Sequence, residues 1–234
     1  MGSAHTRIYL ARHGSVVPEW RGRLYGDLDV PLDPRGEAEA RELAERLRPV
    51  ELHALACSDL GRARFGAACL AAGRDLTPRI DPRLRELSRG DWAGKHPAEV
   101  DAADGGWSRW RRDPARQRPP NGESLADLWA RVAPALDELC AEAIAAAARR
   151  GASQPLAALV AHGWVLRCTA AHALGLPLAQ ADNLSVPPAG LLAVDWPAQG
   201  LCSGHPILAG LDLDRPLDEG AAWYRLPRPA AGVP

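Results

Sequence analysis

Short apolar runs alternate along the chain with longer stretches whose apolar residues recur at helical spacing. Four of the runs have the length of a strand, at residues 8–11, 54–57, 156–161 and 191–194. Continuous apolar runs are typical of strands that are buried on both faces of a parallel sheet. The alternation of strands and helices therefore predicts an α/β protein, with a three-layer α/β/α sandwich around a mostly parallel central sheet.

Turn and capping residues indicate where the predicted helices begin and end. Asp33 is expected to cap a helix that starts at Pro34 and ends before Pro49, because a short acceptor followed by a proline suits the first helical turn. We expect its inner face to carry Ala38, Leu43 and Leu47. Further helices are predicted over residues 60–72, 122–150 and 165–174, and a further strand over residues 79–86.

Residues 91–122 interrupt this pattern, because they are rich in Trp, Gly, Pro and Arg. Such a composition predicts an irregular, lid-like excursion with short helical pieces. Its Trp107 and Trp110 would either stack on an aromatic substrate or bury the excursion itself. The Pro- and Gly-rich tail after Trp196 specifies little structure. We expect residues 1–234 to form a single domain, since one alternating pattern runs through a chain of this length.

The composition, with 47% hydrophobic and 24% charged residues, is near that of an average globular protein and excludes wholesale disorder. Lys and Arg number 28 against 29 Asp and Glu, so no net field would draw the chain to nucleic acid or an anionic membrane. Five cysteines without a CxxC pair argue against a disulfide framework and a zinc site. The sequence has no signal-peptide core and no run of about 18 uncharged apolar residues. We therefore expect a cytoplasmic protein without a metal, nucleic-acid or membrane partner.

Two histidines directly follow the ends of predicted strands, and a glycine follows each of them. His13 comes after the first strand and Arg12, and His162 comes after the third strand. Ligands of open parallel sheets bind beyond the carboxyl ends of the strands, so both imidazoles would face one site if their strands are neighbours. A lone histidine in such a place is more often structural. Together with Arg12, with Ser58 at the end of the second strand and with Arg62 shortly after it, the pair favours a functional site for an anion.

Several short motifs follow one another along the chain in a fixed order. They are Arg12-His13-Gly14, Gly22-Arg23, Gly26, Pro31-Leu32 and Gly36, then Ser58, Leu60 and Arg62, Glu86 with Gly90-Asp91-Trp92, Gly122-Glu123-Ser124, and Ala161-His162-Gly163. In this order and spacing the chain resembles the histidine phosphatase superfamily, the phosphoglycerate mutase-like proteins, from residue 8 to about residue 196. Within that superfamily, residues 22–32, 90–92 and 119–125 are most similar to α-ribazole phosphatases.

The resemblance implies phosphoryl transfer through a phosphohistidine, with no cofactor and no metal. His13 would be the nucleophile, and Glu86 would donate a proton to the leaving group. The phosphoryl oxygens would be held by Arg12, Arg62 and His162. Guanidinium groups suit this task because they donate paired hydrogen bonds and stay protonated. An imidazole attacks only through a neutral nitrogen, so we expect the other ring nitrogen of His13 to be bonded to a nearby carbonyl.

Some positions bear on the substrate rather than on the reaction. Arg23, Tyr25 and Gly26 lie close to the nucleophile in the motif order, and we expect them to touch substrate, with a packing role as an equal alternative for Tyr25. Glu19 stands where the superfamily commonly has asparagine, so either the loop turns it outward or the phosphate pocket is weaker than usual. Trp164 replaces a small residue after the last His-Gly, where it would narrow the mouth or form a stacking wall.

The resemblance favours a metal-independent phosphomonoesterase that hydrolyses a small-molecule phosphate ester, with α-ribazole phosphate as the suggested substrate. Two other functions stay open. A mutase would return the phosphoryl group to the substrate, which requires retention of a bisphosphorylated intermediate and exclusion of water. A non-catalytic anion-binding protein is supported by Glu19 and Trp164. The sequence leaves the oligomeric state open, a homodimer included.

Overall fold

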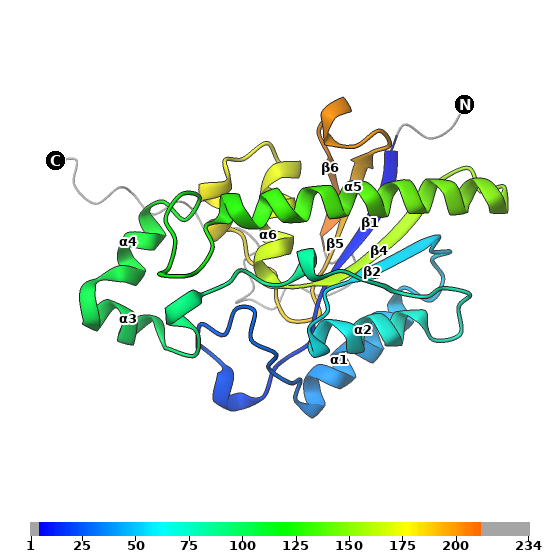
Figure 1. Cartoon of the computed structure of the whole chain (residues 1–234). Helices are drawn as coiled ribbons and strands as arrows, with labels where there is room; N and C mark the ends of the chain where they lie inside the picture. The colour runs from blue at the N-terminus through cyan, green and yellow to red at the C-terminus, as the bar shows by residue number, and fades with distance from the viewer. Residues whose placement is uncertain (1–4, 212–234) are drawn as a thin grey trace.

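The structure of this protein, a computed structural model, describes residues 5–211 (Figure 1). Within these residues the chain forms a six-stranded sheet of order β3-β2-β4-β1-β5-β6. The strands are β1 (His5–Arg12), β2 (Ala54–Cys57), β3 (Arg79–Ile80), β4 (Leu156–Ala161), β5 (Leu191–Pro197) and β6 (Ile207–Leu211). The α-helices of this part of the chain are α1 (Pro34–Arg46), α2 (Gly61–Ala71), α3 (Pro97–Asp104), α4 (Gly106–Arg112), α5 (Leu125–Arg150) and α6 (Gly163–Ala173).

The mostly parallel sheet that the sequence predicts is confirmed. Strands β3, β2, β4 and β1 run parallel, whereas β5 pairs antiparallel with β1, and β6 pairs antiparallel with β5. In the register of the parallel strands, Arg12 lies opposite Ala161 and Cys57 lies opposite Val160. The residues that follow these strands are therefore gathered at one edge of the sheet.

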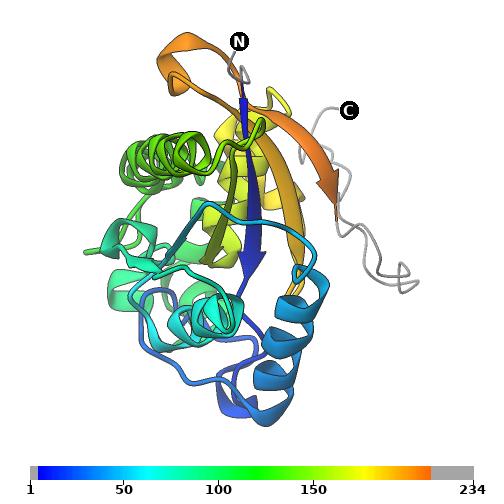
Figure 2. The ribbon, with the colours of Figure 1, turned by 90° about the vertical axis from the view of Figure 1, so that its right-hand side faces the viewer.

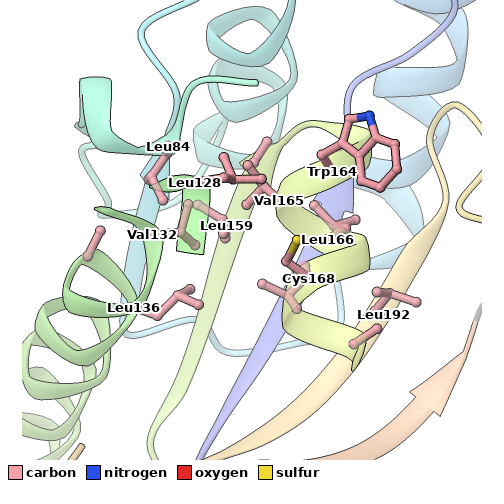
Figure 3. Close-up of a cluster of buried hydrophobic side chains, with 14 of the residues drawn as sticks. Leu84, Leu128, Val132, Leu136, Leu159, Trp164, Val165, Leu166, Cys168 and Leu192 are labelled. Carbon is pink, nitrogen blue, oxygen red and sulfur yellow. The ribbon is translucent and has the colours of Figure 1, made fainter. Parts of the chain in front are cut away.

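Side chains of β4 belong alternately to two cores, as a three-layer sandwich requires. Ala157 and Leu159 lie in a core with residues of α5 and α6, whereas Ala158 and Val160 lie in a core with residues of α1 and α2. Because successive side chains of a strand point to opposite faces, a strand covered on both faces needs a continuous apolar run. Figure 2 shows α5 and α1 on opposite sides of the strands, and Figure 3 shows Leu159 among side chains of α5 and α6.

The first helix begins as predicted but presents a different inner face. The Asp33 side chain accepts a hydrogen bond from the backbone N–H of Gly36 (2.6 Å) and caps α1. Ala38, which was expected on the inner face, is exposed, and Ala40 is buried in its place. Two residues correspond to about 200° around a helix, so Ala38 and Ala40 cannot share a face. The burial of Leu43 agrees with the prediction.

The prediction of a strand over residues 79–86 is wrong beyond the first two residues. Strand β3 ends at Ile80, and residues Pro82–Leu84 form a 3₁₀ turn. Pro82 has no N–H for a sheet ladder, and the Asp81 carboxylate accepts the N–H of Arg83 (2.9 Å), which caps the turn. The chain therefore leaves the sheet before it reaches Glu86.

Residues 91–122 hold the short helices α3 and α4 and irregular connections. Trp107 stacks on Trp110 with ring centres 5.1 Å apart, and Trp110 is 1% exposed. Trp110 also meets the ring of Trp164 edge-on at 5.5 Å. The two tryptophans thus bury the segment against the start of α6, which is the second of the two roles that the sequence left open.

The tail after Trp196 contains more order than its composition predicts, because β6 extends the sheet beyond β5. Residues 212–234 of that tail lie outside the described residues. Among residues 5–211, no helix is both long enough and apolar enough to span a membrane.

Candidate active site

The carboxyl ends of β1 and β4 bring two histidines together. His13 follows β1 directly and His162 follows β4 directly, and the two strands are neighbours. The centres of the two imidazole rings lie 5.2 Å apart. Both side chains are buried, with 2% of His13 and 0% of His162 exposed. The condition that the sequence set for a shared site, neighbouring strands, is met.

The orientation of the His13 ring is fixed by its own loop. Its Nδ1 lies 2.7 Å from the carbonyl oxygen of Gly14, and this contact requires a hydrogen on Nδ1 because a carbonyl can only accept. In the neutral ring, Nε2 then keeps its lone pair. The backbone N–H of His13 donates to Ala161 (3.0 Å), and its carbonyl accepts from Ala189 (3.1 Å). The ring is thus held as the tautomer that can attack through Nε2.

Burial and positive neighbours keep both imidazoles neutral. Burial lowers the pKa of His13 well below its usual 6.5, and the charges of Arg12 and Arg62 lower it further. The pKa of His162 is also lowered well below 6.5, by burial first and then by Arg62. At neutral pH both rings are therefore uncharged, which is the state that nucleophilic attack by an imidazole requires.

His162 has an unusual environment for a core histidine. Neither of its ring nitrogens has a hydrogen-bond partner among residues 5–211, although none of the residue is exposed. Buried polar groups are nearly always hydrogen-bonded, because an unpaired group loses its hydration without compensation. A purely structural histidine would be expected to bond at least one nitrogen. The unpaired ring therefore favours a binding role for His162 over a packing role.

Two guanidinium groups lie beside the histidines. The terminal nitrogens of Arg62 donate to the carbonyls of Leu28 (2.6 Å) and Gly26 (2.8 Å), and the side chain is 1% exposed. Arg12 donates to the carbonyl of Val186 (2.5 Å). In the part of the chain that the structure describes, the Nε atom of each guanidinium is buried and has no hydrogen-bond partner. Carbonyl oxygens carry no net charge, so they orient both groups without neutralising them.

Glu86 reaches the same edge of the sheet from the 3₁₀ turn. Its carboxylate accepts the N–H of Leu87 (2.9 Å) and the N–H of Trp164 (3.1 Å), and the residue is 8% exposed. A β-carbon placed on Gly163 would lie 3.5 Å from Oε2 of Glu86 and 3.6 Å from Cζ of Arg12. The carboxylate and the guanidinium therefore both border the residue that follows His162.

The residues expected to touch substrate divide into two groups. Tyr25 lies under the guanidinium of Arg62, with 5.3 Å between Cζ and the ring centre, and Gly26 accepts from the same guanidinium. Both therefore lie beside Arg62. Arg23 donates to the carbonyls of Glu19 and Gly94, each at 2.9 Å, so the structure joins it to neighbouring loops rather than to His13.

The two departures from the superfamily pattern have clear structural settings. Glu19 lies exposed in the short 3₁₀ helix Pro18–Trp20, so the loop turns its carboxylate outward. Trp164 is 7% exposed, and its ring lies between the guanidinium groups of Arg89 (5.5 Å) and Arg167 (4.8 Å). Its contact with the Glu86 carboxylate uses the backbone N–H only. That contact can be made by any residue other than proline.

Sequence reasoning missed Arg89, which is the centre of an aromatic cluster. Its Cζ lies 4.7 Å from the ring centre of Trp110 and 5.5 Å from that of Trp107, and 5% of the residue is exposed. Burial lowers the pKa of Arg89 to about 10. The one feature of the sequence that could have pointed to Arg89 was its position three residues after Glu86. Nothing in the sequence indicated that three tryptophans would surround it.

Comparison with known proteins decides the family. The family profile of the histidine phosphatase superfamily (branch 1) matches residues 8–202. The chain belongs to this superfamily. The matched region agrees with the range of about 8–196 over which the motifs of the sequence resemble it.

Relatives within the superfamily include proteins named as phosphatases and as mutases. "Probable phosphoglycerate mutase GpmB" of Enterobacter sp. (strain 638) is 33% identical over 219 residues, which is 91% of this chain and 98% of that protein. A mycobacterial glucosyl-3-phosphoglycerate phosphatase is 32% identical with a TM-score of 0.77, covering 88% of this chain and 97% of that one. An α-ribazole phosphatase from Shigella flexneri is 27% identical with a TM-score of 0.71, covering 88% and 96%.

Proposed function

We propose that this protein is a metal-independent phosphomonoesterase that works through a phosphohistidine at His13. The observation that carries the proposal is the pair of buried, neutral imidazoles at 5.2 Å, flanked by Arg12 and Arg62. A phosphate monoester brings negative charge that two guanidinium groups can bind, and a neutral imidazole supplies a lone pair for attack on phosphorus.

In the first half-reaction, the lone pair of Nε2 of His13 forms the N–P bond as the bond between phosphorus and the ester oxygen breaks. The leaving alkoxide takes a proton from the carboxyl group of Glu86, so that an alcohol departs and a carboxylate remains. The hydrogen bond from Nδ1 of His13 to the Gly14 carbonyl stabilises the positive charge that the ring gains.

In the second half-reaction, a water oxygen attacks phosphorus and the N–P bond breaks, which returns the electron pair to Nε2 of His13. The Glu86 carboxylate accepts the proton that the water loses. Inorganic phosphate then leaves, and both residues are restored. The backbone N–H groups of Leu87 and Trp164 hold the carboxylate in place for both proton transfers.

The oxygens of the transferred group are assigned to Arg12, Arg62 and His162. Charge on these oxygens builds up while the phosphoryl group moves between donor and acceptor, so fixed positive groups stabilise that stage most. A neutral His162 donates through only one ring nitrogen, which makes the two arginines the main source of binding energy.

The substrate class is phosphate esters of small alcohols. Two observations support it: the likeness to α-ribazole phosphatases, and the 32% identity to a protein named as a glucosyl-3-phosphoglycerate phosphatase. Both kinds of substrate are alkyl esters, whose alkoxide needs the proton from Glu86. Among named substrates, α-ribazole phosphate and glucosyl-3-phosphoglycerate are the first to test.

A mutase is the second candidate, because a relative at 33% identity carries that name. The two activities differ in the acceptor of the phosphoryl group. With 3-phosphoglycerate, a phosphatase releases inorganic phosphate, whereas a mutase gives 2-phosphoglycerate with little phosphate. Product analysis by ³¹P NMR separates the two.

The proposal is tested by hydrolysis of a panel of phosphate esters by the wild type, His13→Ala and His205→Ala. His205 is exposed and serves as the matched histidine control. We expect His13→Ala to lose at least about 10³-fold in kcat and His205→Ala to keep wild-type rates. Equal rates for His13→Ala and the wild type would overturn the proposal.

A further inference from the structure

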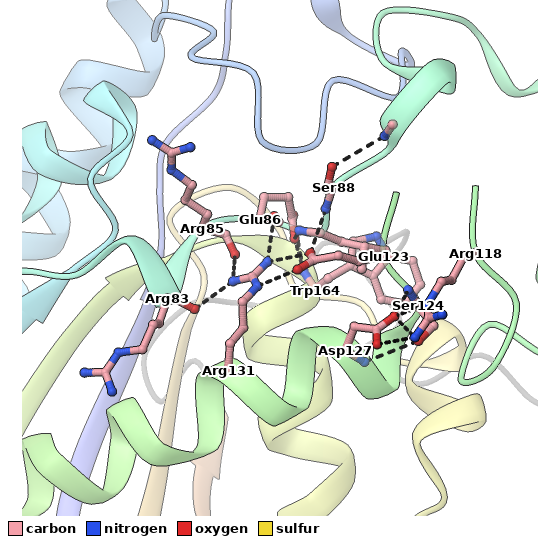
Figure 4. A network of polar contacts seen from close by, with 12 residues as sticks. Arg83, Arg85, Glu86, Ser88, Arg118, Glu123, Ser124, Asp127, Arg131 and Trp164 are labelled. Atoms are coloured by element: carbon pink, nitrogen blue, oxygen red, sulfur yellow. Dashed lines mark hydrogen bonds and ion pairs between the residues drawn. The ribbon is translucent and has the colours of Figure 1, made fainter. Parts of the chain in front are cut away.

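Among residues 5–211, no strand pairs with the segment that carries Glu86. Residues after β3 leave the sheet, so the backbone carbonyls of this segment need partners from elsewhere. Arg131 of α5 supplies them from one side chain (Figure 4). Its NH1 donates to the carbonyls of Arg83 (2.6 Å) and Arg85 (2.8 Å), and its NH2 donates to the carbonyl of Glu86 (3.0 Å).

The other side of the Arg131 guanidinium is held by Glu123. Its Nε donates to Oε1 and its NH2 to Oε2 of that carboxylate, each at 2.8 Å. Glu123 in turn accepts the N–H of Ser88 (3.0 Å) and donates its own N–H to the Ser88 carbonyl (3.1 Å). Hydrogen bonds therefore hold the backbone on both sides of Glu86. Arg131 binds carbonyls up to and including that of Glu86, and Glu123 binds the backbone of Ser88 after it.

A guanidinium is suited to this task because its donors form a rigid planar fork. Donors on one side of the Arg131 guanidinium bind the backbone carbonyls, and donors on the other side bind the Glu123 carboxylate, which fixes the plane of the guanidinium. Both side chains are about three-quarters removed from solvent, with 21% of Arg131 and 24% of Glu123 exposed. The contacts are therefore only partly screened by water.

We propose that Arg131, oriented by Glu123, is the positioning residue that sets Glu86 for proton transfer to the leaving oxygen. The inference rests on the proposed function. Arg131 binds the backbone of Glu86 and the amides of Leu87 and Trp164 bind its carboxylate, so the residue is fixed at both ends. General acid catalysis requires the acid within hydrogen-bond reach of the leaving oxygen, so a loose backbone impairs that step first.

This role predicts a dependence on the leaving group. A nitrophenolate is stable without a proton, whereas an alkoxide is a poor leaving group unless it is protonated as the bond breaks. Loss of the Arg131 contacts should therefore slow alkyl phosphates much more than p-nitrophenyl phosphate. A residue that only supports folding would reduce the rates of both esters by the same factor.

The test compares Arg131→Gln with Arg85→Gln on an alkyl phosphate and on p-nitrophenyl phosphate. Arg85 lies on the same segment, but its side chain binds Asp59 at the surface and leaves the carbonyls untouched. We expect Arg131→Gln to lose about 10²-fold in kcat/KM on the alkyl ester and less than about tenfold in kcat/KM on the aryl ester. The ratio kcat/KM is compared because it reports the transfer of the phosphoryl group to His13, whereas kcat also contains the hydrolysis of the phosphohistidine, which is common to both esters. Arg85→Gln should keep the wild-type ratio. Equal losses on both esters for Arg131→Gln would overturn the proposal.

A double-mutant cycle with Glu86→Gln gives a second measurement. If Arg131 acts through Glu86, adding Arg131→Gln to Glu86→Gln costs little further rate on the alkyl ester. Full additivity would overturn the positioning role. If Arg131→Gln does not fold by circular dichroism, Glu123→Gln replaces it and must show the same preference for the aryl ester. If Glu86→Gln itself shows no selectivity between the esters, the assignment of Glu86 as the general acid in the proposed function is wrong, and the positioning role falls with it. If Glu86→Gln is selective and Arg131→Gln is not, the positioning role alone is wrong.

Discussion

At the scale of single residues, the site depends on histidines that are kept uncharged. Most proteins pair a buried imidazole with an acceptor, and a carboxylate partner would favour the charged form. Here the partner of His13 is a carbonyl, and the nearby charges are positive. Burial and the charges of Arg12 and Arg62 lower the pKa of His13, and they outweigh the hydrogen bond to Gly14, which raises it. Nε2 is therefore available at a pH where an ordinary histidine is already partly protonated.

The first prediction concerns the titration of His13 and His162 in the free protein. Burial and the two arginines lower both pKa values, so we expect both rings to stay neutral at pH 6 in ¹H–¹⁵N NMR spectra. In the denatured protein the same rings should titrate near about 6.5. Titration of either ring in the folded protein at or above that value would contradict the account of the site.

At the scale of elements, β1 and α1 meet through two glycines. A β-carbon on Gly14 would lie 2.1 Å from the carbonyl oxygen of Gly36, and one on Gly36 would lie 2.0 Å from that of Ser15. The loop after the nucleophile therefore packs directly on the first turn of α1. Gly14 and Gly36 are therefore both needed for this close approach of backbone to backbone, whatever the chemistry of the site.

We expect Gly14→Ala to destabilise the protein by about 3 kcal/mol or more, because the atoms that the new β-carbon would meet all belong to the backbone of Gly36, which cannot move aside as a flexible side chain could. The matched control is Gly73→Ala, at a position with φ of +72° and open space around it. That change should cost only about 1 kcal/mol, from the left-handed backbone alone. Urea denaturation of both variants measures the difference, and similar losses would contradict the packing argument.

Sequence patterns predicted the elements well where local signals suffice. The strand runs 54–57 and 156–161 coincide with β2 and β4, since a run that fills two cores is apolar at every position. The failures arose where tertiary contacts decide. Residues 79–86 have an apolar spacing compatible with a strand, but Pro82 and the Asp81 cap turn the chain instead. Strand β6 was not predicted because it is defined by its pairing with β5, a tertiary contact, and not by a local sequence pattern.

The same distinction holds for the site. His13 and His162 directly follow β1 and β4, so the topology of a parallel sheet was enough to expect the two histidines together. The phosphate-binding roles of Arg12 and Arg62 came from the resemblance to the superfamily. Arg131 was not predicted because its partners are carbonyls at the ends of a turn, and backbone acceptors have no sequence signature.

At the scale of the whole molecule, the neutral histidines connect the site to the pH dependence of folding. The folded-state pKa values of His13 and His162 are depressed, so below pH 6.5 the unfolded chain binds protons that the folded protein does not. Stability therefore rises with pH through this window. The contribution of these two histidines to stability is fully present above pH 6.5, and it is lost as the pH falls toward their folded-state pKa values.

We expect the free energy of unfolding to fall between pH 7.5 and pH 5.5, by up to about 1.4 kcal/mol per pH unit for each histidine below its unfolded pKa. Carboxylates stay ionised over most of this range, which isolates the histidines. The His162→Ala variant should lose less stability over the same interval than the wild type. A stability that is flat or increases toward pH 5.5 would contradict the sign of the shift.

The most direct test of the central claim is to identify the phosphorylated residue during turnover. The wild type is mixed with a phosphate ester and quenched within the first turnovers, and its peptides are analysed by mass spectrometry under conditions that preserve phosphohistidine. We predict one phosphoryl group on His13, absent from His13→Ala and retained in Arg131→Gln. Turnover without a phosphoryl group on His13, or with one on another residue, would contradict the account.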